Sequence, residues 1–203
     1  MDPSFRVIDP YRSMMTTAPF TPSFATKPTT MKRIILTYGL IGGVIVSAMM
    51  WFTLGDGMHD WENGELIGYT TMVIALSTIF FGIKAYRDKE LGGTIRFGKA
   101  FLVGLYITLI ASTMYVASWM VMSANMKQDF MEQYIEHTTT KLEQSGASDE
   151  EVEAQVAELR QMAELYKNPV VKIGFTYMEI LPVGLLISLL CAALLKRNAL
   201  PVG

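Results

Sequence analysis

The sequence has few of the residues on which catalytic and metal sites usually depend. It contains one cysteine, Cys191, and two histidines, His59 and His137. A single thiol cannot form an internal disulfide, so cysteine usage says nothing about the redox compartment. Neither histidine has a ligand partner at the spacing of a zinc motif, and neither a Walker loop nor a G-x-S-x-G turn occurs. The sequence therefore predicts no catalytic residue, no metal site, no cofactor and no enzymatic activity.

Charge is also scarce, and it is unevenly distributed. Charged residues make up 18% of the 203 residues, against roughly 25% in soluble domains. The net charge of −2 gives no indication of nucleic-acid binding. A helix needs about 20 apolar residues to cross the hydrocarbon core, and helices of soluble proteins keep a polar face. Four windows that lack such a face are therefore predicted to span a membrane: residues 34–54, 66–83, 101–125 and 173–195.

The basic residues gather on connections that a four-span topology places on one side of the membrane. Because short cytoplasmic loops carry an excess of Lys and Arg, both termini are predicted to be cytoplasmic. The loop "GDGMHDWENGE" carries only acidic charges, and Trp51, Trp61 and Trp119 lie near the outer ends of the spans, as interfacial anchors do. The basic residues that determine this topology are Lys32, Arg33, Lys84, Arg87, Lys89, Arg96, Lys99, Lys196 and Arg197.

Residues 1–30 contain five of the eight prolines and no apolar periodicity. They lack the continuous apolar region of a secretory signal peptide. Two interpretations remain open. Either this segment is a disordered cytoplasmic leader, or the start has been assigned too far upstream and "MKRIILTYGL", beginning at Met31, opens a signal-anchor helix.

Residues 126–171 are predicted to form an outward-facing helical hairpin. No Gly or Pro occurs between Gly104 and Gly146, so the helix of span three is expected to continue for about 30 Å beyond the membrane. The segment "SGASDEE" is expected to form the turn, with Ser148 and Glu151 as a capping box. The carboxylates are interpreted as a solvated face, since helical carboxylates diverge instead of converging on a cation. Two seams of coiled-coil spacing are expected to pack antiparallel: Met131, Ile135, Thr138 and Leu142 with Val152, Val156, Leu159, Ala163, Tyr166 and Val170.

Glu179 is the one charge inside a span, and Pro182 follows it. Ionisable residues within a membrane are costly and usually functional, and a proline there frees a backbone carbonyl. These two residues are the intramembrane polar candidates. A role of Glu179 in transport or proton exchange, and a structural pairing with a Tyr, Ser or Thr of a neighbouring span, both remain open.

Small residues recur at four-residue spacing in three spans. Such stripes let helix backbones approach closely, and packing within the bundle is favoured over a dimer face. The stripes are Gly39, Gly43 and Ser47; Gly104, Thr108 and Ser112; and Gly184, Ser188 and Ala192.

Two segments carry a resemblance to a known family: "GIKAYRDKELGGTIRFGKAFLVGL" after span two and "YMEILPVGLLISLLCAALLKR" in span four. The chain resembles the bacterial four-span family catalogued as domain of unknown function 4199, over about residues 31–197. The resemblance implies a bacterial inner-membrane protein, supports Met31 as the start and leaves the leader outside. It supplies no catalytic residue, and it adds interest to Glu179 and Pro182.

The sequence thus predicts an all-α fold: one integral membrane domain over residues 31–203, formed by a four-helix bundle whose spans three and four extend into the hairpin. The leading functional hypothesis is a non-enzymatic protein of the bacterial inner membrane. It would be surrounded by the lipid bilayer and would bind an envelope protein, or a second copy of itself, through residues 126–171. The alternative is a small oligomeric transporter or channel subunit that uses Glu179, and a membrane enzyme comes third.

Overall fold

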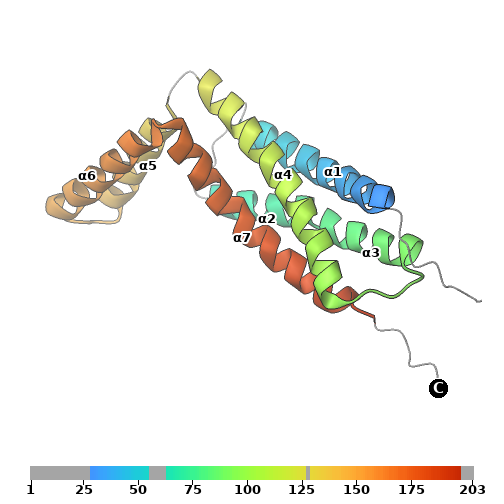
Figure 1. Ribbon diagram of the computed structural model, residues 1–203. Helices are drawn as coiled ribbons and strands as arrows, with labels where there is room; N and C mark the ends of the chain where they lie inside the picture. Colours follow the sequence, from blue (N-terminus) through green and yellow to red (C-terminus); the bar gives the residue numbers. More distant parts are fainter. Residues whose placement is uncertain (1–27, 55–62, 127–128, 198–203) are drawn as a thin grey trace, which may run out of the picture.

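The fold is all-α, as the sequence predicts. The structure, a computed structural model, describes residues 28–54, 63–126 and 129–197 (Figure 1). The leader up to residue 27 and the acidic loop at 55–62, with His59 and Trp61, lie outside the described residues. Within the described ranges the chain forms helices and no strand: α1 (Pro28–Leu54), α2 (Gly64–Leu76), α3 (Thr78–Glu90), α4 (Phe97–Asn125), α5 (Phe130–Gln144), α6 (Asp149–Tyr166) and α7 (Pro169–Leu195).

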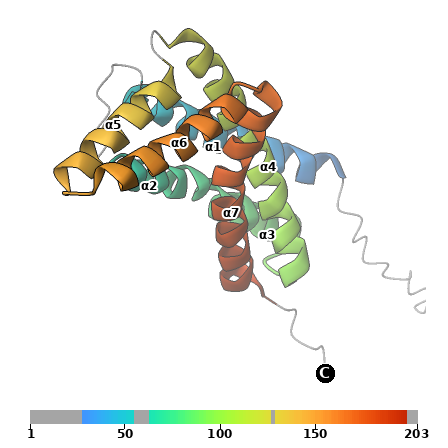
Figure 2. The same cartoon turned by 90° about the vertical axis from the view of Figure 1, so that its left-hand side faces the viewer.

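Four lengths of helix pack as a bundle (Figures 1 and 2): α1, α2 together with α3, α4, and α7. The break between α2 and α3 is a local distortion at Ser77, whose Oγ donates a hydrogen bond to the carbonyl of Ile74 at 2.6 Å. The helices are longer than the apolar windows that the sequence predicts. Lys and Arg at a helix end can remain helical in the backbone while their side chains reach the headgroup region. The lengths apolar enough to cross a membrane are Thr30–Leu54, Leu66–Glu90, Phe97–Asn125 and Pro169–Leu195.

The bundle is apolar on its outside as well as in its core. Ile79, Val103, Ile107 and Ile180 are fully buried between the helices. A helix of a soluble protein keeps polar residues on the face that points away from the core. Here the exposed faces carry large apolar side chains instead, so this exterior is suited to lipid. Examples are Leu36, Leu40, Val44, Leu186, Leu190 and Leu194.

Small side chains allow α4 and α7 to approach closely. A Cβ atom added to Gly104 would lie 2.9 Å from Ser188 Oγ, and one added to Gly184 would collide with Thr108. Thr108 Oγ1 donates a hydrogen bond to the carbonyl of Gly184 at 3.3 Å and lies 3.1 Å from Ser188 Oγ. The glycines of the α1 stripe face α4 in the same way. The prediction that these small residues serve packing within the bundle is therefore confirmed.

Replacing Gly184 by leucine is expected to destabilise the bundle, because the new side chain would force α4 and α7 apart at Thr108. Overpacking of a tight contact typically costs about 1–3 kcal/mol. Gly174 lies on the same helix with nothing within 4 Å of an added Cβ, so Gly174→Leu is the matched control and should be neutral or slightly stabilising. Thermal unfolding in detergent measures both variants, and equal midpoints would contradict the argument.

The hairpin is a separate pair of helices and not a continuation of α4. Helix α4 ends at Asn125, Met126 has an extended backbone (φ −66°, ψ 138°), and α5 begins only at Phe130. The Asp129 side chain caps α5 by accepting a hydrogen bond from the N–H of Met131 at 2.8 Å. The prediction of a continuous helix was therefore wrong. It considered only Gly and Pro as helix breakers, whereas a side-chain cap can also start a new helix.

A second break in the helical path separates α6 from α7. Asn168 Oδ1 caps α7 by accepting a hydrogen bond from the N–H of Val170 at 2.9 Å, and Pro169 occupies the first turn. This confirms that the return helix ends before Pro169. It also removes Val170 from the seam, since that side chain is exposed on α7. With a break at each end, the hairpin leaves the bundle at an angle instead of keeping the direction of α4 and α7 (Figures 1 and 2).

The interior of the hairpin follows the predicted seams. Gly146 closes α5 with a positive φ of 81°. At the start of α6, Ser148 Oγ accepts from the N–H of Glu151 at 3.4 Å, and Ser148 N–H donates to Glu151 Oε2 at 3.0 Å, so the capping box is confirmed. Apart from Val170, the predicted seam positions are buried or half-buried: Met131, Ile135, Thr138, Leu142, Val152, Val156, Leu159, Ala163 and Tyr166.

Ser148→Ala should loosen the first turn of α6 by about 1 kcal/mol, since it removes the oxygen that accepts from Glu151 N–H. Hydrogen–deuterium exchange of the first amides of α6 measures this change. Gln144→Ala, at the exposed end of α5, serves as the control and should leave the exchange unaltered.

The same cap should depend on pH. Hydrogen bonds from Ser148 lower the pKa of Glu151. A group with a lowered pKa stabilises the folded state while it is ionised, so this contribution is present above the ordinary carboxyl pKa and is lost as the pH falls through the lowered value. After correction for intrinsic rates, exchange in the first turn of α6 should speed up under acid. Ser148→Ala should weaken that dependence.

Candidate functional site

Aromatic side chains fasten the hairpin to the end of the bundle from which it projects. The indole Nε1 of Trp119 in α4 donates to the hydroxyl of Tyr166 in α6 at 2.8 Å, and the two rings of Trp119 and Phe130 meet edge to face at 5.2 Å. Lys172 Nζ lies 5.1 Å from the centroid of the Tyr166 ring, and the Phe175 ring lies 6.2 Å from it. These five residues, here called the hairpin anchor, join α4, α5, α6 and α7.

The anchor gives Trp119 a role that its position in the sequence did not indicate. Its side chain is only 6% exposed, so it is not the interfacial anchor that the sequence predicted, whereas Trp51 is exposed at the end of α1. Burial raises the pKa of Tyr166, although the hydrogen bond from Trp119 opposes the shift. The phenol keeps its proton at physiological pH, and its oxygen accepts from the indole N–H.

Tyr166→Phe should free the hairpin from the bundle without unfolding either, because the buried indole N–H of Trp119 loses its acceptor. Leaving a buried donor unpaired costs about 1–3 kcal/mol. Faster hydrogen exchange at the end of α6 and the start of α7 is the expected readout. Tyr106→Phe removes the same hydroxyl from an exposed position on α4 and should change nothing. Equal exchange in the two variants would argue against the anchor.

Glu179 lies on α7 and is exposed at the surface of the bundle. The phenol of Tyr115 on α4 lies near its carboxyl group, close enough for the two to interact electrostatically. A tyrosine of a neighbouring span thus lies beside Glu179, and a structural pairing of the two stays a prediction. Pro182 stands inside the same helix, which continues without interruption to Leu195. A function for Glu179 or Pro182 in transport stays a prediction.

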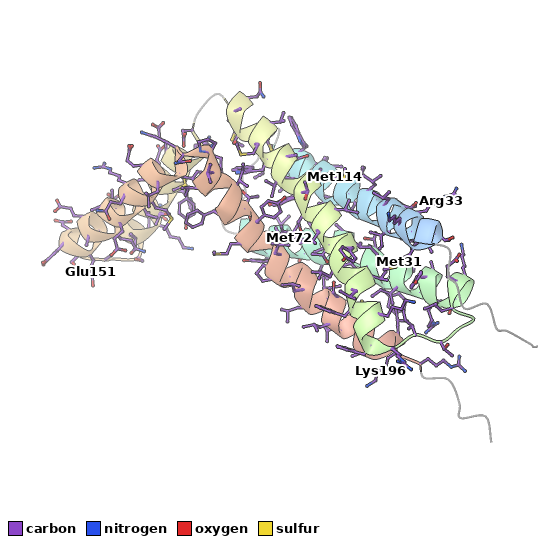
Figure 3. All side chains as sticks on the ribbon, in the orientation of Figure 1. Met31, Arg33, Met72, Met114, Glu151 and Lys196 are labelled. Atoms are coloured by element: carbon purple, nitrogen blue, oxygen red, sulfur yellow. The ribbon has the colours of Figure 1, made fainter. Side chains whose placement is uncertain are left out.

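The predicted topology-determining basic residues gather at the other end of the bundle. Helices α1 and α4 start there, and α3 and α7 end there (Figure 1). In Figure 3, Arg33 and Lys196 mark this cationic end, and Glu151 marks the far tip of the hairpin. The structure therefore brings together side chains that four separate segments supply, and it places the acidic hairpin at the opposite end.

Backbone contacts hold the cationic end together. Ile95 and Arg197 form an isolated antiparallel bridge, with N–H to carbonyl distances of 3.0 and 2.9 Å. Arg87 Nη1 donates to the carbonyl of Leu195 at 3.4 Å, and its Nε pairs with Asp88 at 2.7 Å. The loop after α3 is thus tied to the chain that leaves α7.

The hairpin carries a groove along one side, between α5 and α6, with a volume of about 690 Å³. The sequence did not predict it, because a groove depends on how two helices rotate against each other. The only available signal was that the carboxylates of α5 recur at helical spacing beside the seam. The groove is lined by Asp129, Met131, Glu132, Ile135, Glu136, Thr139, Thr140, Glu143, Val156, Arg160, Ala163, Glu164 and Lys167.

Within the described residues, no three His, Cys, Asp or Glu side chains lie close enough together to hold a metal ion. Comparison with known families gives one finding: the model of a family described as "Protein of unknown function (DUF4199)" matches residues 37–197. The leader lies outside the match. No curated protein and no solved structure gives a significant match to the chain.

Proposed function

We propose that the chain, which belongs to this family of proteins of unknown function, is a non-enzymatic protein of the bacterial inner membrane that binds another protein of the cell envelope through the hairpin α5–α6. Its termini would lie in the cytoplasm and its hairpin outside. Four apolar helices with an apolar exterior support a place in a membrane. The gathering of Lys and Arg at the end opposite the hairpin supports the orientation.

The observation that carries this proposal is the contrast between the two ends of the hairpin. Its base is fastened to the bundle by the hairpin anchor. Beyond that base, none of the residues of α6, all of which the structure describes, is buried. Even next to the base, apolar side chains of α6 such as Met162 and Leu165 remain exposed, Leu165 to 60%. A rigidly held pair of helices with uncovered faces is suited to protein binding, because little ordering is needed when the partner arrives.

The alternative, a small transporter or channel subunit using Glu179, has less support. A transport site is expected to face a path between helices. Glu179 instead is exposed at the bundle surface, beside Tyr115. Only an oligomer that covers this surface would place the carboxylate on a path through the membrane.

One experiment tests both the orientation and the binding. Single cysteines are introduced in turn at Gln144, Gln155 and Gln161, which are exposed on the hairpin, and at Lys89 as the control at the cationic end. Intact spheroplasts are treated with a membrane-impermeant maleimide that carries a photo-crosslinker. We expect hairpin cysteines to be labelled and to yield protein adducts on illumination, and Lys89→Cys to be labelled only after lysis. Native Cys191 is buried and should react little.

Two results would contradict the proposal. Labelling of Lys89→Cys but not of the hairpin cysteines in intact spheroplasts would reverse the orientation. Labelled hairpin cysteines that yield no protein adduct from any of the three positions would remove the binding role.

A further inference from the structure

We infer that the groove between α5 and α6 is the docking site of a basic amphipathic helix of a partner protein. This inference rests on the proposed function and names the chemistry of the partner. The floor of the groove is apolar, formed by Met131, Ile135, Val156 and Ala163. A third helix laid over this floor would complete a three-helix bundle, which is the usual way in which an apolar helix face binds a groove.

The rim of the groove selects the charge of the partner. On the α6 side of the rim, Lys167 Nζ pairs with Glu164 at 2.6 Å, so these two side chains offset each other, and Arg160 adds one positive charge against the four carboxylates that α5 and its cap Asp129 contribute. The α5 side of the rim carries Glu132, Glu136 and Glu143, none of which forms an ion pair within the part of the chain that the structure describes. Successive carboxylates along one edge match a row of Lys or Arg beside an apolar stripe on the incoming helix.

The length of the groove fits a helix of a few turns. Its α5 edge runs from Asp129 to Glu143, which corresponds to about 21 Å at 1.5 Å per residue. A partner helix over that distance presents apolar side chains at i, i+3 or i+4 and i+7 to the floor. Its flanking cations then lie opposite the glutamates of the rim.

Charge also argues against a second copy of the hairpin as the occupant. Between Asp129 and Lys167 the chain has ten Asp or Glu residues and three Lys or Arg residues, and so a net charge of −7. Two such hairpins repel each other at physiological ionic strength. An anionic lipid surface is disfavoured for the same reason. A cationic helix is attracted and gains contact with the apolar floor as well.

The test uses the full-length protein in nanodiscs of zwitterionic lipid and a synthetic helix of the same length as α6, 18 residues, with a leucine stripe flanked by lysines. The groove variant is E132Q/E136Q/E143Q. The matched control, E150Q/E153Q/E158Q, removes the same charge from exposed hairpin positions that do not line the groove. We expect the groove variant to weaken binding about tenfold and the control by about twofold or less. Binding by the wild type should also weaken as salt rises.

Several outcomes would overturn the inference. Equal weakening in both variants would show attraction by net charge without a docking site. Equal binding of a peptide with glutamates in place of the lysines would remove the charge argument. If the wild type forms dimers and the groove variant does not, the occupant of the groove is a second copy of the chain. If the wild type binds anionic vesicles and the groove variant does not, the occupant is lipid. Unchanged exchange protection of α5 and α6 in both variants shows that the hairpin remains folded.

Failure here can be separated from failure of the proposed function. If cysteines on the hairpin yield protein adducts in spheroplasts while the groove variant binds the basic peptide like the wild type, the hairpin binds its partner by another face. If no hairpin cysteine yields an adduct, the binding role itself is removed.

Discussion

The close contact between α4 and α7 is the constraint on which the rest of the structure depends. Lipid chains are as apolar as leucine, so helices in a membrane gain little from burying apolar surface and associate through tight packing. Gly104 against Ser188 and Gly184 against Thr108 provide that packing. The hydroxyl of Thr108 is satisfied within the contact by the Gly184 carbonyl, as a polar group without access to water requires.

Both ends of the molecule follow from this contact. The hairpin is connected to the bundle through α4 and α7, so the spacing of these two helices determines where α5 and α6 begin and end. The anchor then bridges the same pair of helices, since Trp119 belongs to α4 and Lys172 to α7. At the cationic end, the Ile95–Arg197 bridge ties the segment that leads into α4 to the segment that leaves α7. The anchor at one end and the Ile95–Arg197 bridge at the other thus connect the same two helices that the small residues hold in contact.

The sequence predicted those features that depend on composition and missed those that depend on geometry. The scarcity of charge predicted the four spans, and the small residues predicted the contacts between them. Both patterns recur at every turn of a helix, so they can be read from the sequence alone. The break after Asn125 was missed because it arises from one side chain, Asp129, whose carboxylate competes for a backbone N–H. The burial of Trp119 was missed for a related reason: its partner, Tyr166, is far away in the sequence and reaches it only once the hairpin has folded back.

The break and the anchor together determine the direction in which the hairpin projects. If α4 and α5 formed one continuous helix, the hairpin would project in the direction of that span. The extended residue at Met126 and the cap at Asn168 turn the pair aside, and the Trp119–Tyr166 bond then holds it in one direction. The groove therefore has a defined place relative to the bundle, with its glutamates at the opposite end of the molecule from the cluster of cations. Under the proposal, a basic helix is attracted to the hairpin and repelled by the cationic end, so the distribution of charge proposed to orient the protein would also select what it binds.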